Sequence, residues 1–247
     1  MGGGGAGAMK TLSMVVPCRN EARRLDQTAF VEAVEKWPWM SFCFVDDGST
    51  DSTAEILAHL VNLHPAFHAI YLPTNVGKAE AVRAGMRHVC ANTHADFAGF
   101  WDADLATPLC EVPRFMRIFD KSPETKAVIG SRWPHLGADI RRTAGRGLAG
   151  GLAKLIIRRV LGAQVWDTQC GAKIFARELA DAIFRDRFRL RWLFDVELLL
   201  RLGKRLKSEV RECPLESWFD VPGSNVGLSA LGELLALPFL RLGVCHG

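Results

Sequence analysis

The chain has 247 residues, 49% of them hydrophobic, which is enough for one α/β domain with a substantial core. It carries 31 Lys and Arg against 27 Asp and Glu, and the formal charge of +4 is too small to indicate a nucleic-acid-binding protein. The seven cysteines contain no CxxC pair, which is typical of the reducing cytoplasm, and no apolar run reaches the about 18 residues of a spanning helix.

The first ten residues are rich in glycine and lack the apolar core of a signal peptide, so we expect residues 1–10 to form a flexible leader. After this leader, short apolar runs alternate with helical patterns. The predicted strands cover residues 12–17, 41–47, 66–72, 96–102 and 126–132. The predicted helices cover residues 21–36, 51–63, 77–91 and 111–121. This alternation is typical of an α/β fold in which crossover helices join parallel strands.

The alternation becomes irregular after residue 132. An amphipathic pattern with glycines and a basic face predicts a helix over residues 145–162, and further strands are predicted within 166–175 and 209–219. Seven basic residues lie between Arg132 and Arg159 against one acid, Asp139. This excess indicates contact with an anionic partner such as a membrane surface, and the alternative is a packed helix with a solvated basic side. Residues 227–247 form an apolar, amphipathic tail that suits an interfacial or core helix.

Polar motifs follow four of the predicted strands. VPCRNE ends the first strand, VDDGS the second, FWDADL the fourth and GSRW the fifth. Ligands of open parallel sheets bind beyond the carboxyl ends of the strands, so these motifs should converge on one edge. We therefore expect the functional site at that edge.

The FWDADL motif places Asp102 and Asp104 one residue apart, where two negative charges repel each other. A divalent cation between these carboxylates and an anionic ligand removes the repulsion, and oxygen-only ligands favour Mg²⁺ or Mn²⁺ with a diphosphate. The alternative is an acidic turn without a ligand. The motif alone does not separate the two, because short motifs recur by chance.

Two further motifs are consistent with a nucleotide ligand. Asp46 and Asp47 of VDDGS could accept hydrogen bonds from a base or a ribose, or the motif could be a helix cap followed by a turn. Lys78 and the preceding NVG open a predicted helix and could face a phosphate. The chain has no GxxxxGK[ST] P-loop, no GxGxxG after the first strand and no zinc-ligand spacing.

The order of these motifs resembles the family 2 glycosyltransferases of the GT-A fold. VPCRNE, VDDGSTD, NVGKAEAVRAG, WDADLATP and GSR follow one another as in that family. DTQCGAKIF, RWLFDVELL and ECPLESWFDVPGSNV are similar to the dolichyl- or polyprenyl-phosphate glucosyltransferases and mannosyltransferases. The resemblance covers roughly residues 11–228 and implies a single GT-A domain over 11–226, with a Rossmann-like, mostly parallel mixed sheet flanked by helices.

The resemblance also implies roles for individual residues. The nucleotide pocket would include Pro17, Arg19, Glu21, Val45, Asp47, Lys78 and the backbone of Ala103. Asp102 and Asp104 would bind the metal and the diphosphate. Arg132 would meet the donor diphosphate or the acceptor phosphate, with Asp167 and Gln169 beside the acceptor, so that Asp104, Arg132 and Asp167 are the expected catalytic residues. Some mannosyltransferase relatives have a glutamine metal ligand where this chain has Ala106, which favours the glucosyl branch.

The implied activity is inverting transfer of a hexose from UDP-glucose, or from GDP-mannose, to a polyprenyl or dolichyl phosphate at the cytoplasmic face of a membrane. A lipid phosphate is already an anion, so its attack needs positioning and charge stabilisation but no strong base. One alternative is a family 2 enzyme with a soluble hydroxyl acceptor, which would need a base such as Asp195 or Glu197. The other is a non-catalytic protein that binds a nucleotide sugar.

Overall fold

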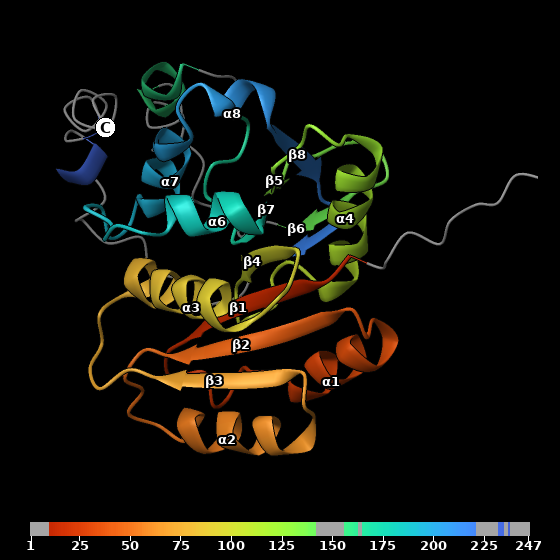
Figure 1. Cartoon of the computed structure of the whole chain (residues 1–247), viewed down its shortest axis with the longest axis vertical. Coiled ribbons are helices and arrows are strands. Elements are labelled where there is room, and N and C mark those ends of the chain that lie inside the picture. Colours follow the sequence, from red (N-terminus) through yellow and green to blue (C-terminus); the bar gives the residue numbers. More distant parts are fainter. Residues whose placement is uncertain (1–9, 142–155, 163–164, 221–231, 235–236, 238–247) are drawn as a thin grey trace, which may run out of the picture.

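The computed structural model of the chain describes residues 10–141, 156–162, 165–220, 232–234 and 237. Its centre is a seven-stranded sheet with the strand order β3-β2-β1-β4-β7-β5-β8 (Figure 1). The strands are β1 (Leu12–Cys18), β2 (Met40–Asp46), β3 (Phe67–Tyr71), β4 (Phe97–Trp101), β5 (Ala127–Ser131), β7 (Ala172–Ala176) and β8 (Val210–Pro214). Neighbouring strands are parallel except that β7 runs antiparallel between β4 and β5. The predicted mixed, mostly parallel α/β sheet is confirmed.

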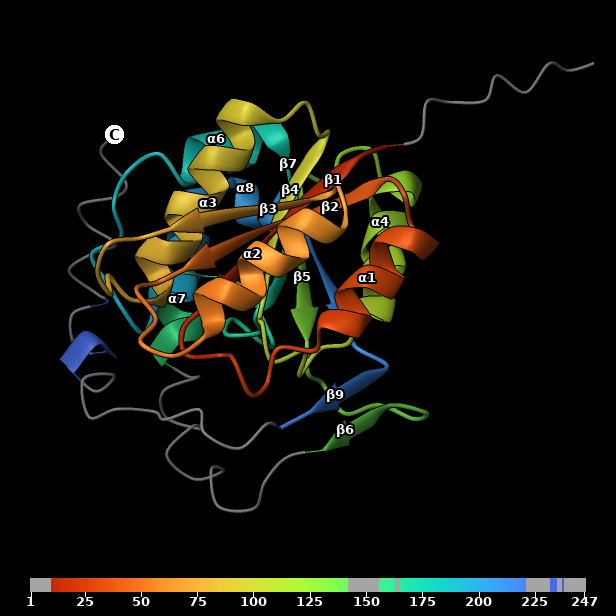
Figure 2. The same ribbon diagram turned by 90° about the horizontal axis from the view of Figure 1, so that it is seen from below.

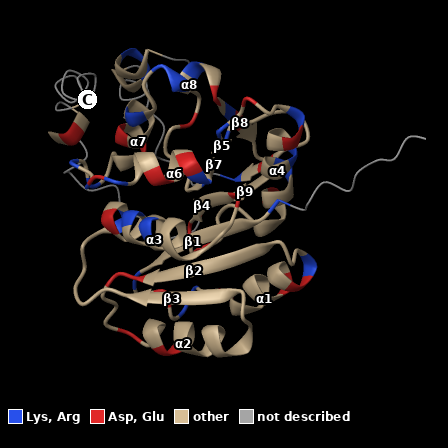
Figure 3. Cartoon of the chain, in the orientation of Figure 1, with Lys and Arg blue, Asp and Glu red and all other residues tan. Residues whose placement is uncertain are grey.

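Helices cover both faces of this sheet (Figure 2). One face packs against α1 (Gln27–Lys36), α2 (Thr53–Leu63) and α4 (Val112–Lys121), which follows the short 3-10 helix η1 (Leu109–Glu111). The other face packs against α3 (Lys78–Asn92), α6 (Arg177–Ile183), α7 (Phe194–Leu202) and α8 (Arg205–Ser208). Because both faces are covered, the strands are almost continuously apolar, as Figure 3 shows by the scarcity of charged residues along them.

A second, two-stranded parallel sheet lies beside the main one. Its strands are β6 (Asp139–Arg141) and β9 (Ser217–Phe219). The predicted strand at 209–219 is therefore two strands, β8 and β9, in two different sheets. The chain changes sheet where Glu111 accepts hydrogen bonds from the backbone N–H groups of Glu216 and Ser217, at 2.9 and 3.0 Å.

Two other predicted boundaries are wrong for similar reasons. The first helix begins at Gln27 and not at residue 21, because Thr53 and Asp51 accept hydrogen bonds from the N–H groups of Glu21 and Ala22 and hold a turn there. Asp26 then caps the helix by accepting from the Ala29 N–H at 3.1 Å. The strand predicted within 166–175 begins only at Ala172, since the residues before it form part of the candidate site.

The described part of the predicted helix at 145–162 is an ordinary packed helix. Residues 156–161 are helical, and Ile157 and Val160 are buried against α7 together with Leu234 and Leu237 of the C-terminal segment. Residues 142–155, with Arg142, Arg146 and Lys154, and most of the predicted tail at 227–247 lie outside the described residues. Within the described ranges, no helix combines the length and the apolar character needed to span a bilayer.

Candidate active site

The candidate site lies at the edge of the main sheet where β1, β2, β4 and β5 end. The parallel register of these strands brings their terminal motifs to the same edge, as expected from the sequence. Asp102 follows β4, Asp47 follows β2, Arg19 follows β1 and Arg132 follows β5. The site therefore consists of loops that a rigid sheet positions.

Asp102 lies in a closely packed position between Lys78 and Gly171. Its carboxylate forms an ion pair with the Lys78 ammonium at 2.5 Å, and its backbone N–H donates to the Gly171 carbonyl at 3.1 Å. A Cβ atom added to Gly171 would overlap this carboxylate, because it would lie only 2.6 Å from the Asp102 Oδ1 atom. Residue 171 must therefore be glycine for Asp102 to keep its position.

Asp104 is held by a tight turn. Leu105 has a φ of 50°, in the left-handed region that leucine rarely adopts, and the Asp104 carboxylate accepts from the Ala106 N–H at 3.1 Å. Strain of this kind persists where the surrounding structure fixes it, often at functional sites.

Burial and the Asp102 charge raise the pKa of the Asp104 carboxyl. Burial also raises the pKa of Glu21, against the effect of Arg24 and helped by Asp104 and Asp102. Burial lowers the pKa of Lys78, but the charges of Asp102, Asp195 and Asp104 outweigh this and raise it. These effects show that Glu21, Asp102 and Asp104 are close enough to repel one another, with Lys78 as a counter-ion.

This donor set fits a hard divalent cation. The groups are carboxylate oxygens, which Mg²⁺ and Mn²⁺ prefer, and a cation would relieve the repulsion that raises their pKa values. No group of three His, Cys, Asp or Glu side chains within the described ranges is arranged to hold a metal by itself. Mg²⁺ is usually bound by one or two carboxylates together with substrate phosphates, so the Asp102–Asp104 pair fits a cation shared with a bound diphosphate. Ala106, at the position of the absent glutamine, is buried and offers no side-chain ligand.

Asp47 links the second strand to the loop before α3. Its two carboxylate oxygens accept hydrogen bonds from the backbone N–H groups of Val76 and Gly77, at 2.7 and 2.9 Å. Gly77 has a φ of 91° and precedes Lys78, the first residue of α3. The Asp47 carboxylate thus fixes the position of the Lys78 loop, and the residue is only 3% exposed.

The other residues predicted for the nucleotide pocket differ in accessibility. The Arg19 guanidinium donates to the Asp47 carbonyl at 2.8 Å, so it stabilises the VDDGS turn, and Pro17 is half-buried opposite Val45. Val45 itself is 0% exposed and packs where α3 approaches the sheet at Gly85. The Val45 side chain therefore belongs to the core, and Ala103 is buried on the turn between the two aspartates.

Arg132 and Asp167 form a two-point ion pair on the other side of the site. Arg132 Nε and Nη2 lie 2.6 and 2.7 Å from the two Asp167 oxygens, and the Arg132 backbone N–H donates to Oδ2 at 3.0 Å. Burial alone would raise the pKa of the Asp167 carboxyl. The hydrogen bonds and the positive charge of Arg132 outweigh this effect, so the pKa is lowered. Gln169 is exposed beside the pair, and its N–H donates to Asp167 at 3.2 Å.

Sequence reasoning missed Glu212, which supports this ion pair from behind. Its Oε1 atom accepts hydrogen bonds from the backbone N–H groups of Trp166 and Asp167, both at 3.0 Å. The glutamate is the first residue of the ECPLESWF motif, but the sequence does not indicate these partners, which lie 45 and 46 residues away along the chain. Gly171 was missed likewise, although it lies within the DTQCGAKIF motif.

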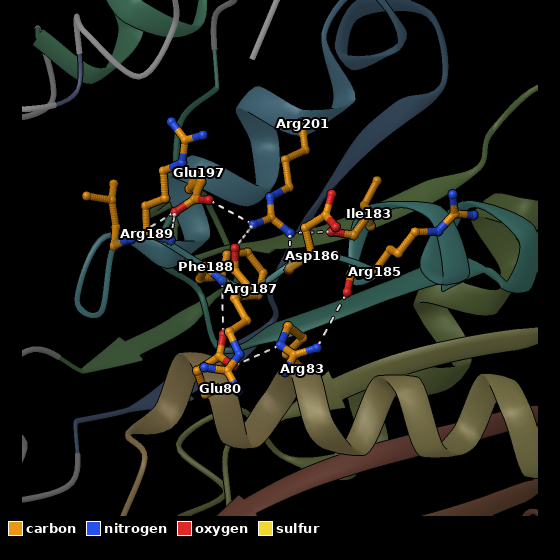
Figure 4. Close-up of polar contacts among 11 residues, drawn as sticks. Glu80, Arg83, Ile183, Arg185, Asp186, Arg187, Phe188, Arg189, Glu197 and Arg201 are labelled. Atoms are coloured by element: carbon orange, nitrogen blue, oxygen red, sulfur yellow. Dashed lines mark hydrogen bonds and ion pairs between the residues drawn. The ribbon is translucent and has the colours of Figure 1, made fainter. Parts of the chain in front are cut away.

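The two carboxylates proposed as bases for a hydroxyl acceptor are structural. Asp195 is buried and forms an ion pair with the fully buried Lys173 at 2.5 Å. Glu197 accepts from the N–H groups of Arg189 and Leu190 and from Arg201, at 2.8, 2.9 and 2.8 Å (Figure 4). Both therefore stabilise the fold around α7, which removes the bases that the soluble-acceptor alternative required.

Comparison with known proteins identifies relatives of this arrangement. A dolichyl-phosphate beta-glucosyltransferase of Trichomonas vaginalis is 35% identical, over 89% of this chain and 67% of that protein. The enzyme of the same name from Saccharomyces cerevisiae is 30% identical, over 88% of this chain and 70% of its own. Both matches extend along almost the whole chain.

Solved structures share the fold. Glucosyl-3-phosphoglycerate synthase from Mycobacterium tuberculosis, in complex with Mn²⁺, UDP and phosphoglyceric acid, superposes with a TM-score of 0.69 at 18% identity, over 97% of this chain and 80% of that one. Its complex with Mg²⁺ and UDP gives a TM-score of 0.67 at 21% identity, over 96% and 80%. The model of the family described as Glycosyl transferase family 2 matches residues 13–184. The chain belongs to glycosyltransferase family 2.

Proposed function

We propose that this protein transfers glucose from UDP-glucose to a polyprenyl or dolichyl phosphate, with inversion at the anomeric carbon. The observation that carries the proposal is the position of the Asp102–Asp104 pair at one sheet edge with Lys78 on one side and the Arg132–Asp167 pair on the other. Support comes from the relatives at 30 and 35% identity, which are named dolichyl-phosphate beta-glucosyltransferases.

The donor half of the site would bind the nucleotide. Asp47 would meet the ribose or base while it holds the Lys78 loop. Asp102 and Asp104 would hold Mg²⁺ or Mn²⁺, which supplies charge stabilisation to the diphosphate leaving group. Lys78 would neutralise part of the same diphosphate, as an ammonium beside a helix N-terminus can. The M. tuberculosis structures with UDP and Mn²⁺ or Mg²⁺ support this choice of ligands.

The acceptor half would be the side of Arg132 and Asp167. The ion pair with Asp167 orients the Arg132 guanidinium, whose planar group suits a phosphate. A phosphate oxygen of the acceptor forms the bond to the anomeric carbon as the bond from that carbon to UDP breaks. The nucleophile is already anionic, so the reaction does not need the base that Asp195 or Glu197 would have supplied.

The location proposed for this reaction is the cytoplasmic face of a membrane, because a polyprenyl phosphate is held in a bilayer. The +4 charge and the basic residues near Arg132 favour binding to an anionic surface. We expect liposome flotation to recover the protein with anionic vesicles at low salt and to recover much less of it at high salt. Absence from anionic vesicles even at low salt would contradict this location.

The test of the function is a transfer assay with two donors and two acceptor classes. UDP-glucose and GDP-mannose are each supplied with a polyprenyl phosphate or with a soluble sugar, and nucleotide release and product are both measured. We expect product from UDP-glucose and polyprenyl phosphate, and none in EDTA. Transfer to the soluble sugar alone supports the rival acceptor class, and nucleotide binding without any product supports the non-catalytic alternative.

A further inference from the structure

Two tryptophans are exposed side by side next to the candidate acceptor site. Trp133 and Trp166 are 48% and 45% exposed, and their ring centroids lie 4.2 Å apart. Leu136, a few residues further on, is completely exposed. Large apolar side chains that gather on a surface usually mark a binding site, whereas single ones do not.

The Arg132–Asp167 ion pair causes this arrangement. Trp133 directly follows Arg132 and Trp166 directly precedes Asp167, so the two-point ion pair brings the two indoles together. Glu212 fixes the backbone on the Trp166 side by accepting from its N–H group at 3.0 Å. The aromatic pair is thus positioned by the same contacts that orient the Arg132 guanidinium.

A cation lies against the aromatic pair. The Arg158 guanidinium lies 4.7 Å from the centre of the Trp166 ring. Arg132, in its ion pair with Asp167, lies 5.2 Å from the ring of a third tryptophan, Trp218. The surface therefore offers the Arg158 charge beside an apolar face. This combination is complementary to one kind of ligand: an anionic head joined directly to a hydrocarbon chain.

We propose that the surface formed by Trp133 and Trp166 binds the isoprenoid chain of the acceptor lipid, next to the phosphate. The inference rests on the proposed function, because it assigns the chain of the same acceptor whose phosphate faces Arg132. The flat indole faces give large apolar contact at small conformational cost, and they accept a flexible chain without a closed pocket. The surface thus selects lipid phosphates over small water-soluble phosphates.

The test measures lipid binding and transfer separately, in detergent micelles without a bilayer. The variants are Trp133→Ala and Trp166→Ala, with Trp133→Phe as the conservative substitution. Leu63→Ala is the control, since Leu63 is 53% exposed on α2 beside β3, at the opposite edge of the sheet. Intrinsic tryptophan fluorescence is titrated with a polyprenyl phosphate and with inorganic phosphate, and the KM of each substrate is measured.

We expect the KM for polyprenyl phosphate to rise roughly ten- to a hundredfold in each alanine variant, because alanine removes the apolar indole surface that would cover the chain. The KM for UDP-glucose should not change, Trp133→Phe should keep most of the affinity, and Leu63→Ala should match the unmodified protein. The fluorescence of the unmodified protein should respond to polyprenyl phosphate and not to inorganic phosphate, and the response should weaken in Trp133→Phe.

Four other results would contradict the lipid-site inference or the proposed function. If transfer occurs but the alanine variants keep the same lipid KM in micelles, the inference is wrong and the tryptophans at most anchor the protein in a bilayer. A raised KM for UDP-glucose would instead assign the aromatic surface to the donor sugar, against the inference. If no polyprenyl phosphate is glucosylated but the tryptophan-dependent lipid binding remains, the proposed function fails and the lipid site stands. If that binding is absent as well, both are overturned.

Discussion

The residues at the centre of the site repel one another in the absence of a ligand. Glu21, Asp102 and Asp104 combine burial with like charges, and this raises the pKa values of Glu21 and Asp104. A carboxyl whose pKa is raised in the folded state contributes stability at low pH, and this contribution is lost as the pH rises through the folded pKa. At neutral pH the ligand-free protein should therefore be strained at this point.

The first prediction concerns Asp104→Asn. The change removes one of the repelling charges and keeps the size of the side chain, so the ligand-free protein should melt at a higher temperature at neutral pH. Transfer should fall by roughly a hundredfold or more, because the charge that would hold the cation and diphosphate is removed.

Differential scanning fluorimetry with and without Mn²⁺ and UDP checks the Asp104→Asn prediction. The unmodified protein should be stabilised by the ligands at neutral pH. The stabilisation should disappear as the pH falls, starting above the range of an ordinary aspartate, since protonation of Asp104 competes with the cation. An equal ligand-induced shift in Asp104→Asn would show that Asp104 does not contribute to the site.

A second prediction at the residue scale tests the contact between Gly171 and Asp102. The methyl group of Gly171→Ala would overlap the Asp102 carboxylate, so Asp102 must move away from Lys78. We expect weaker UDP-glucose binding, measured by isothermal titration, with circular dichroism unchanged. Gly232→Ala is a matched control for replacing a glycine, because nothing lies within 4 Å of a Cβ there and its φ is not in the left-handed region. Unchanged affinity in Gly171→Ala would remove the positioning role.

The third prediction compares two arginine ion pairs. Lysine keeps the charge of Arg132 but cannot make the two parallel hydrogen bonds to Asp167. Arg132→Lys should reduce transfer to polyprenyl phosphate by roughly ten- to a hundredfold, from the loss of one charge-assisted bond of about 1.5–3 kcal/mol. Arg87→Lys, at an exposed ion pair with Asp181, should have little effect. Equal losses in the two variants would mean that only the general charge matters.

At the scale of elements, the first five strands could be predicted because each is a short run of mostly apolar residues between helical patterns, and four of them end in a polar motif. What the sequence could not show was pairing between distant segments. The antiparallel insertion of β7 between β4 and β5, and the change of sheet between β8 and β9, depend on contacts far along the chain. The start of α1 was missed for the same reason, because side chains of Asp51 and Thr53 bind the backbone of residues 21 and 22.

In the candidate site, too, local motifs could be recognised from the sequence but contacts between distant residues could not. Asp102, Asp104, Lys78, Arg132 and Asp167 could be singled out because each belongs to a recognisable motif, and their roles stay predictions. Asp102, Asp104 and Arg132 follow strands, whereas Lys78 opens α3 and Asp167 lies before β7. The supporting contacts from Gly171 and Glu212 could not, since neither has a property in the sequence that indicates its partner. The resemblance placed Val45 in the nucleotide pocket, but its side chain is buried beneath α3, where Gly85 approaches the sheet.

The fourth prediction concerns the buried ion pair between β7 and α7. Lys173 and Asp195 are a buried ion pair, so Lys173→Met leaves a buried carboxylate without this partner. The free energy of unfolding should fall by about 3–5 kcal/mol in urea denaturation. The double variant Lys173→Met/Asp195→Leu should recover much of this stability. If Lys173→Met is harmless, the pair does not stabilise the fold, and Asp195 again becomes available as a base.

For the whole molecule, one sheet edge joins two chemically different halves. The half proposed for the donor combines acidic oxygens with Lys78, and the half proposed for the acceptor combines Arg132 with exposed tryptophans. In the proposed reaction, a water-soluble nucleotide sugar and a lipid phosphate meet at the same edge while each contacts a surface of suitable polarity. The buried positions of Asp195 and Glu197 agree with a nucleophile that needs no base.

The central claim is a single displacement at the anomeric carbon by a lipid phosphate. UDP-glucose carries its glucose in the α configuration, so one displacement must give a β-linked glucosyl phosphate. The direct measurement is proton NMR of the purified product formed from UDP-glucose and polyprenyl phosphate, with the anomeric coupling constant read before hydrolysis. The account predicts only β-glucosyl polyprenyl phosphate. An α-linked product, or free glucose with no lipid-linked sugar, would contradict it.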